Sequence, residues 1–171
     1  STSLGKGEYG SGNSAVAFSP GDYRYVRITD IDDRGNLKGD PVAVEDADQE
    51  YGKYSVSVGD LLFARTGATV GKTYLYKSED GPCIYAGYLI RFRLNTELAI
   101  PEYVYMVTRT NAYWRWVERC QNVVAQPNIN AKQYGGDFLF PLPPLSEQER
   151  FMRIYKKVQQ QIGRFNSALR E

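Results

Sequence analysis

The most regular hydrophobic pattern in the chain lies at its C-terminal end, where an apolar side chain recurs every three or four residues. The positions of this seam are Phe151, Tyr155, Val158, Ile162, Phe165 and Leu169. A strict seven-residue repeat favours a partner helix supercoiled against the seam over burial in a globular core. Ser146 and Glu149 have the spacing of a capping box. We therefore expect a helix over residues 146–171 that projects from the body and pairs with a second helix.

Before that helix, short runs of alternating apolar and β-branched residues predict strands. The runs cover residues 23–31, 54–58, 60–65, 73–77 and 84–94, with a closing strand over 137–142. Pro101 and the apolar spacing after it predict a helix that ends near Cys120. Residues 1–20 and the acidic stretch up to Glu50 are expected to be irregular. The predicted class is α+β: a curved mixed β-sheet domain with short helices over residues 1–145, followed by a long coiled-coil-type helix over residues 146–171.

Composition indicates an ordered globular protein. Of the 171 residues 42% are hydrophobic, with 14 Tyr and 7 Phe, enough for a core in one domain of about 140 residues. Cys83 and Cys120 fit no metal or redox spacing, so we expect a reduced, cytoplasmic setting. No apolar run approaches the roughly 20 residues of a membrane span. Histidine is absent, which removes the commonest general base and metal ligand, and no catalytic residue, metal site or cofactor is predicted.

The net charge of +1 conceals an uneven distribution of charge. Residues 30–60 hold nine acids and three bases, whereas residues 61–77 hold Arg65, Lys72 and Lys77 and no acid. This pattern predicts a basic loop face for phosphates and an acidic face directed away from them. The glycines and Lys72 in residues 67–73 miss the P-loop spacing by one residue, and a strand follows instead of a helix, so nucleotide binding is not predicted. A plain hairpin with solvated charges remains the alternative.

Residues 141–150, with the sequence PLPPLSEQER, closely resemble the end of a target recognition domain in the specificity subunits of type I restriction-modification enzymes. Residues 25–31 (YVRITDI), 59–73 and 126–130 (QPNIN) resemble further segments of that family in the same order. Together these segments span nearly the whole chain. A complete specificity subunit of this family carries two recognition domains and two spacer helices, whereas this chain has room for one of each. We expect either a fragment or a naturally halved subunit.

The resemblance implies a non-catalytic module that recognises one half of a bipartite DNA site and directs adenine methylation or restriction by partner subunits. The implied partners are double-stranded DNA, methyltransferase (modification) subunits that carry S-adenosylmethionine, and an ATP-driven restriction subunit. A second recognition domain, or a second copy of the chain, would pair through the C-terminal helix. The chain itself would supply recognition and no cofactor.

Several loops carry side chains suited to DNA contacts, since Asn and Gln can bind adenine bidentately and Arg can bind guanine or phosphate. The predicted contact residues are Arg24, Arg27, Arg65, Thr66, Lys72, Thr73, Tyr85, Tyr88, Gln121, Asn122, Gln126 and Asn128. Turn capping is an equally good interpretation of any one of the amides. Because the QPNIN segment recurs in family members with different targets, an architectural role for Asn128 and Asn130 also stays open.

The leading alternative function is a scaffold or protein-interaction module whose helix forms a homodimer and whose body binds another protein. A third class, an enzyme acting on nucleotides, would require ATP or a metal to change the thermal stability. Salt dependence separates the first two classes, because DNA affinity falls steeply with ionic strength, whereas binding through an apolar seam does not.

Overall fold

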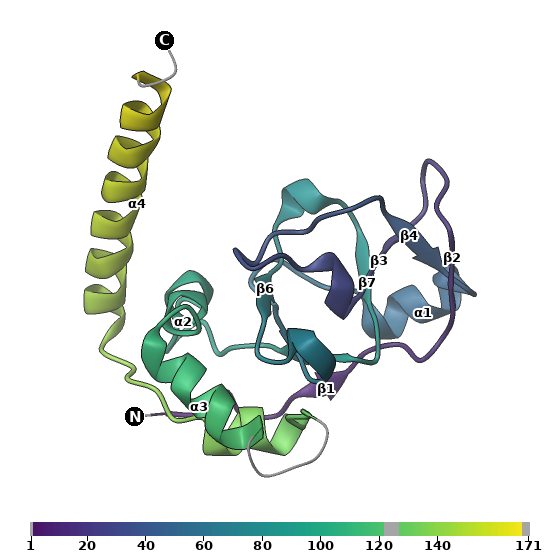
Figure 1. Ribbon diagram of the computed structural model, residues 1–171, viewed down its shortest axis with the longest axis horizontal. Helices are drawn as coiled ribbons and strands as arrows, with labels where there is room; N and C mark the ends of the chain where they lie inside the picture. Colours follow the sequence, from purple (N-terminus) through teal and green to yellow (C-terminus); the bar gives the residue numbers. More distant parts are fainter. Residues whose placement is uncertain (1, 122–126, 169–171) are drawn as a thin grey trace.

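The computed structural model describes residues 2–121 and 127–168. Figure 1 shows a body of short strands and short helices, and a long C-terminal helix that stands away from that body. This helix, α4 (Leu145–Ala168), meets the body only near its foot, beside α2 (Pro101–Val107). Among the described residues, no helix combines the length and the apolar character needed to cross a membrane.

The central sheet has four strands, and each neighbouring pair is antiparallel. In sheet order they are β1 (Glu8–Tyr9), β8 (Leu89–Phe92), β5 (Leu61–Ala64) and β6 (Thr73–Leu75). Two smaller sheets complete the body. One pairs β2 (Ala15–Ala17) with β4 (Val42–Val44) in antiparallel fashion, and the other pairs β3 (Arg24–Val26) with β7 (Cys83–Tyr85) in parallel. Strands and helices together confirm the predicted α+β class, but the predicted mixed sheet is divided into one antiparallel four-stranded sheet and two separate two-stranded sheets.

Helices and single turns connect the strands. The other α-helices are α1 (Ala47–Tyr54) and α3 (Asn111–Gln121). The short 3-10 turns are η1 (Ile28–Asp30), η2 (Gly67–Thr69) and η3 (Ser78–Asp80), and η4 (Gln133–Asp137) is a π-helical turn. Helices α2 and α3 lie together between α4 and the strands (Figure 1).

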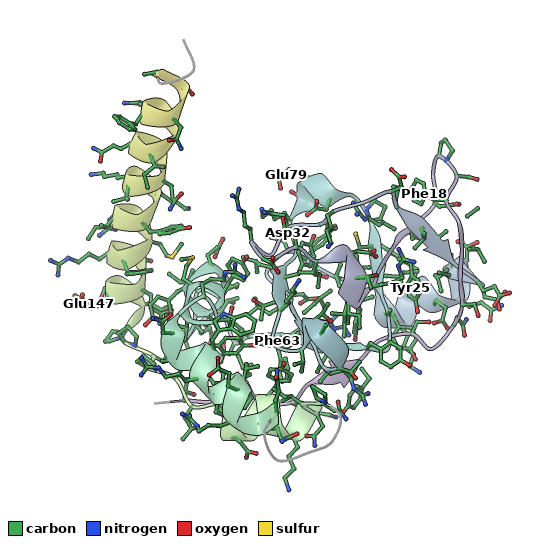
Figure 2. The ribbon with its side chains drawn as sticks, viewed as in Figure 1. Phe18, Tyr25, Asp32, Phe63, Glu79 and Glu147 are labelled. Carbon is green, nitrogen blue, oxygen red and sulfur yellow. The ribbon has the colours of Figure 1, made fainter. Side chains whose placement is uncertain are left out.

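The core lies on both faces of the central sheet. Successive side chains of a strand point to opposite faces, so Phe63 and Leu62 of β5 enter different clusters. Phe63, labelled in Figure 2, packs edge-to-face on Phe92 with ring centroids 5.3 Å apart, and its centroid lies 4.9 Å from that of Tyr134. Leu62 packs on the opposite face with Tyr85. Burial on both faces explains why β5 is a continuous apolar run, LLFA.

Two long segments fold differently from the prediction. The strand predicted over residues 84–94 is two strands, β7 and β8, because the chain reverses at Gly87, whose amide donates to the Ser11 carbonyl at 2.6 Å. The helix predicted from Pro101 to Cys120 is interrupted between α2 and α3. There the buried Thr108 hydroxyl bonds to the Tyr105 carbonyl and to the Thr73 hydroxyl, both at 2.7 Å.

Several irregular or strand predictions also need correction. Residues 1–20 contain β1 and β2, and the acidic stretch contains β4 and α1. The strand predicted over 54–58 is reduced to a single bridge between Ser55 and Ile84, because α1 extends to Tyr54. The closing strand over 137–142 is likewise a single bridge, between Phe140 and Thr2. Each of these segments takes its conformation from a distant partner that local periodicity does not reveal.

Helix α4 begins at Leu145, so Ser146 lies inside its first turn and the predicted capping box is wrong. The carbonyl of Pro144 accepts the amides of Glu147 and Gln148 instead. Within α4, only Gln148 and Met152 are buried, both in its first two turns. A helix that projects from the body is therefore confirmed over Leu145–Ala168, while its pairing with a second helix stays a prediction.

Candidate functional site

Four chain segments meet on the surface where β5 ends, and their exposed or half-buried side chains form what we call the Arg65 surface. Its members are Tyr9, Arg65, Thr66, Tyr88 and Asn128. Backbone hydrogen bonds join three of these segments. The Arg65 amide donates to the Tyr88 carbonyl at 3.1 Å, and the Arg65 carbonyl accepts the amide of Ile129 at 2.8 Å. Thr66 and Asn128 form an antiparallel bridge beside this pair.

The guanidinium of Arg65 is held by two side chains from distant parts of the chain. Its Cζ lies 4.8 Å from the centroid of the Tyr9 ring, in cation–π geometry. Its Nε lies 3.5 Å from the Asn128 Oδ1, at the outer limit of a hydrogen bond. The Tyr9 hydroxyl is itself fixed by the amide of Ala131 at 3.1 Å. A planar, always-charged donor group is thus oriented before any ligand arrives, which favours binding of phosphate or a guanine edge.

The turn after Arg65 is built rigidly. The Gly67 amide and the Thr66 hydroxyl both donate to the Pro127 carbonyl, at 3.3 and 3.4 Å. Gly71 has a φ of 88°, and a Cβ there would lie 2.8 Å from Val117 of α3, so only glycine fits. Gly71 is therefore required for the close packing of this turn against α3, whereas a Cβ at Gly67 would meet no atom within 4 Å.

Two buried tyrosines clamp the same turn from below. The Tyr134 hydroxyl donates to the Ala64 carbonyl at 2.9 Å and accepts the Gly71 amide at 3.1 Å. The Tyr113 hydroxyl donates to the Gly71 carbonyl at 2.7 Å. Burial raises the pKa of both phenols above the ordinary value, so both stay protonated and can donate these bonds. Hydrogen bonds from these two buried tyrosines therefore fix the backbone that bears the Arg65 surface.

A hollow of about 580 Å³ adjoins the Arg65 surface, and Tyr88, which is 61% exposed, belongs to both. Arg27, Asn13 and Tyr25 are among its other lining residues. The Tyr25 hydroxyl donates to the Asn13 carbonyl at 3.0 Å, which ties the lining of the hollow together (Tyr25 is labelled in Figure 2). Arg27 and Tyr88, distant in sequence, are thus brought to one surface.

Other predicted contact residues are engaged within the protein. The Arg27 guanidinium binds Asp30, with Nη2 2.9 Å from Oδ1, and Arg24 donates to the Lys38 carbonyl at 3.2 Å. The Lys72 ammonium lies 2.8 Å from the Asp33 carboxylate. The hydrogen bond from Lys72 lowers the pKa of Asp33 below its ordinary value. The acidic segment therefore neutralises Lys72 of the predicted basic loop through Asp33. Arg65 and Lys72 do not together form the positively charged face that was predicted.

The prediction of side-chain DNA contacts is wrong for Thr73 and Tyr85, because both side chains are buried. Thr73 is bonded to Thr108 beneath α2. The Tyr85 hydroxyl donates to the carbonyls of Glu8 and Tyr9, at 3.3 and 3.4 Å, and burial raises the pKa of Tyr85 to about 12. The alternating pattern predicted these two strands, but it did not reveal that side chains on both faces of each strand are buried.

The predicted amide cluster is only partly described. Gln121 is half-buried at the end of α3, and Asn122 and Gln126 lie outside the described residues. Asn130 and Gln133 exchange side-chain-to-amide hydrogen bonds, both at 3.0 Å, in the manner of a capping box, so the architectural interpretation holds for Asn130. Tyr9 was missed, because no local signal in the glycine-rich segment around it indicates that it reaches Arg65.

The family model described as "Type I restriction modification DNA specificity domain" matches residues 13–168. No curated protein matches. A chain from a structure of complex assembly and conformational transition in the type I R-M system is similar in fold, with a TM-score of 0.66 and 20% identity, over 96% of this chain and 43% of that one. The HsdS subunit from Thermoanaerobacter tengcongensis is also similar, with a TM-score of 0.62 and 18% identity, over 92% of this chain and 41% of the other. The chain thus spans about two fifths of each solved chain.

Proposed function

Because this chain belongs to the family of type I restriction modification DNA specificity domains, we propose that it recognises one half of a bipartite DNA site through the Arg65 surface. The observation that supports this assignment most directly is the oriented guanidinium of Arg65. An arginine fixed by an aromatic ring and an amide loses little conformational entropy on binding, so its interaction with DNA is preorganised.

The chemistry of the neighbouring side chains fits the same role. Asn128 is exposed next to Arg65, and an asparagine amide can bind adenine N6 and N7. Tyr88 offers an exposed aromatic ring with a polar tip at the rim of the adjoining hollow. Asn122 and Gln126 precede Asn128 in the chain and remain proposed base-contacting residues. Arg24, Arg27 and Lys72, which are already paired within the protein, are proposed to contribute through phosphates.

Helix α4 is proposed to act as the spacer between two recognition domains. Its 24 residues span about 36 Å at 1.5 Å per residue, and its apolar seam is exposed from Phe151 to Phe165 except at the half-buried Tyr155. Antiparallel pairing with a second such helix would set the separation of the two recognised half-sites. Methyltransferase subunits and a restriction subunit would supply the chemistry, and this chain would supply recognition without catalysis.

The test is DNA binding by the chain assembled with the methyltransferase subunits of the same locus, once methylation mapping in cells has given the target. Arg65→Ala is expected to weaken binding about tenfold or more. If Arg65 contacts phosphate, the loss will be equal for target and scrambled duplexes; if it contacts a base, the loss will be confined to the target. Arg34→Ala removes an exposed arginine from the acidic turn that contains Asp33, outside the Arg65 surface, and is the matched control.

Unchanged affinity of the Arg65→Ala protein would remove this surface from the DNA interface. The alternative function, a scaffold joined through α4, predicts that no assembly of the chain binds duplex DNA in a salt-dependent way. A titration from low to high ionic strength distinguishes the two, because phosphate contacts release counterions and apolar contacts do not.

A further inference from the structure

A short turn, residues 32–36, lies against α2 and is held there through its backbone. The Tyr105 hydroxyl of α2 donates to the Arg34 carbonyl at 2.9 Å. Just beyond α2, the Arg109 guanidinium donates to the carbonyl of Asp33. Because both contacts use carbonyl groups of the turn, they fix its position without engaging the Asp33 carboxylate.

The same turn is also fixed from within by Asp32, which is labelled in Figure 2. One oxygen of its carboxylate accepts the amides of Arg34 and Asn36, both at 2.8 Å. Gly35 has a φ of 75°, and a Cβ there would lie 2.1 Å from the Tyr105 hydroxyl, so only glycine fits. The backbone of the turn therefore keeps its conformation independently of its other acidic side chain.

That other side chain, Asp33, contacts the hairpin that bears the Arg65 surface. One of its carboxylate oxygens lies 2.8 Å from the ammonium of Lys72, with side chains 92% and 19% exposed respectively. Within the described parts of the chain, the Lys72 ammonium has no second carboxylate partner. The Lys72 carbonyl accepts the Ala64 amide at 2.9 Å, so Lys72 lies across the hairpin from the residue that precedes Arg65.

We propose that the place of the Asp33 carboxylate is a subsite for a DNA phosphate, and that Asp33 occupies it until a phosphate displaces the carboxylate from Lys72. This assignment depends on the proposed function and adds a residue that limits the affinity for DNA. Carboxylate and phosphate oxygens are both anionic acceptors for an ammonium group. Each DNA strand carries a phosphate about every 3.4 Å along the helix axis, so a strand bound at Arg65 presents further phosphates along the same hairpin.

The exchange of one anion for the other requires little rearrangement. An ion pair with an exposed partner contributes little to stability, so breaking it costs little. The turn stays attached to α2 through its backbone, and only the side chain of Asp33 has to rotate away. A phosphate at Lys72 releases one condensed cation, whereas the freed Asp33 carboxylate attracts one. The Lys72 contact therefore adds little to the affinity or to its salt dependence while Asp33 is present.

The first test is Asp33→Asn, measured by DNA binding of the chain assembled with its methyltransferase subunits. The affinity is expected to rise about fivefold for target and scrambled duplexes alike, since Lys72 no longer has to give up an anion. The plot of log affinity against log salt concentration should steepen by about 0.9, the value for one additional phosphate contact. An increase in affinity cannot result from misfolding. Asp40→Asn is the matched control, because it removes the same charge from an exposed position of the same acidic stretch, and it should change the affinity less than about twofold.

The second test repeats Asp33→Asn in a Lys72→Met protein, which keeps the apolar stem of the lysine and lacks its ammonium. With no ammonium to release, Asp33→Asn should then raise the affinity by less than about twofold and leave the salt slope unchanged. This double-mutant cycle separates competition for Lys72 from a general repulsion between Asp33 and DNA.

Three results would overturn the assignment. If Asp33→Asn leaves the affinity unchanged while Arg65→Ala weakens it, there is no subsite at Lys72, and the proposed function stands. An equal gain from Asp33→Asn with and without the Lys72 ammonium would show that Asp33 only repels DNA. If Arg65→Ala has no effect and the assembly binds duplex DNA without salt dependence, the proposed function fails and the subsite fails with it.

Discussion

The side-chain amide of Gln148, in the first turn of α4, is hydrogen-bonded to the backbone amide of Ile100, with Oε1 2.8 Å from the nitrogen. Its Nε2 donates to the carbonyls of Leu98 and Pro143, at 2.9 and 2.7 Å. The side chain is completely buried. One glutamine thus joins α4 to the turn before α2 and to the segment that leads into α4, and it helps to fix the direction of the helix relative to the body.

Replacing Gln148 by leucine should lower the free energy of unfolding by about 2–3 kcal/mol, since a buried amide and two carbonyls lose their partner. Urea denaturation measures the effect. Gln160→Leu, at an exposed position of the same helix, is the control and should change stability by less than about 0.5 kcal/mol. Equal stability of the two variants would show that water replaces the amide at no cost.

Introducing Asp at both Val158 and Ile162 should abolish pairing of α4, because two charges would be buried in the seam. Sedimentation at several protein concentrations gives the mass. The control carries Asp at Gln160 and Arg164, which have the same spacing on the opposite side of the helix. A dimer that persists in the seam variant alone would show that the copies associate elsewhere.

The stability of the protein should depend on pH through Glu8. Hydrogen bonding to Arg91, with Nε 3.2 Å from Oε2, lowers the pKa of Glu8 from its ordinary value of 4.5. A carboxylate with a lowered folded-state pKa contributes stability that is fully present above pH 4.5 and is lost as the pH falls through the folded-state value. The stability difference between wild type and Glu8→Gln should therefore be largest near pH 7 and shrink towards pH 3.

Thermal or urea unfolding at pH 7, 5 and 3 tests this pH dependence, with Glu97→Gln as a control for the loss of one exposed carboxylate. If the stability difference between wild type and Glu8→Gln stays constant from pH 7 to pH 3, the ion pair does not have this role. Glu8 belongs to β1, and Arg91 of β8 is 4% exposed. The same experiment therefore measures how much their ion pair stabilises the pairing of β1 with β8.

The two cysteines should differ sharply in reactivity. Cys83 is fully buried in β7, and burial raises the pKa of its thiol to about 12, whereas Cys120 is partly exposed near the end of α3. At pH 8 iodoacetamide should therefore alkylate Cys120 in the native protein and Cys83 only in denaturant. Mass spectrometry of the labelled protein shows which of the two cysteines is alkylated under each condition. Native Cys120→Ser protein that still incorporates label would indicate local opening around β7.

Local patterns predicted those elements whose side chains are determined by near neighbours. The run LLFA of β5 and the seven-residue seam of α4 were both visible, because a strand buried on two faces and a helix with one apolar stripe each have their own periodicity. Short strands such as β1 and β4 were not predicted. Two or three residues carry no period, and these strands exist because β8 and β2 lie beside them.

The site shows the same division. Arg65, Thr66, Tyr88 and Asn128 were predicted one by one from residue type and from family resemblance, and the structure brings these four together. Thr73 was assigned to the surface from its neighbours, whereas α2 covers it. DNA contact by the exposed members stays a proposal until binding is measured.

By itself the sequence determined the family, the α+β class and the existence of the long C-terminal helix, since these depend on composition, periodicity and sequence segments of about ten residues. Only the tertiary structure decided that the Tyr9 ring contacts the Arg65 guanidinium, that Asp33 forms an ion pair with Lys72, and that Gln148 is hydrogen-bonded to Ile100. The physical reason is that a hydrogen bond or ring contact requires atoms within a few ångströms. Strand pairing across tens of residues, which no local window contains, is what provides that proximity.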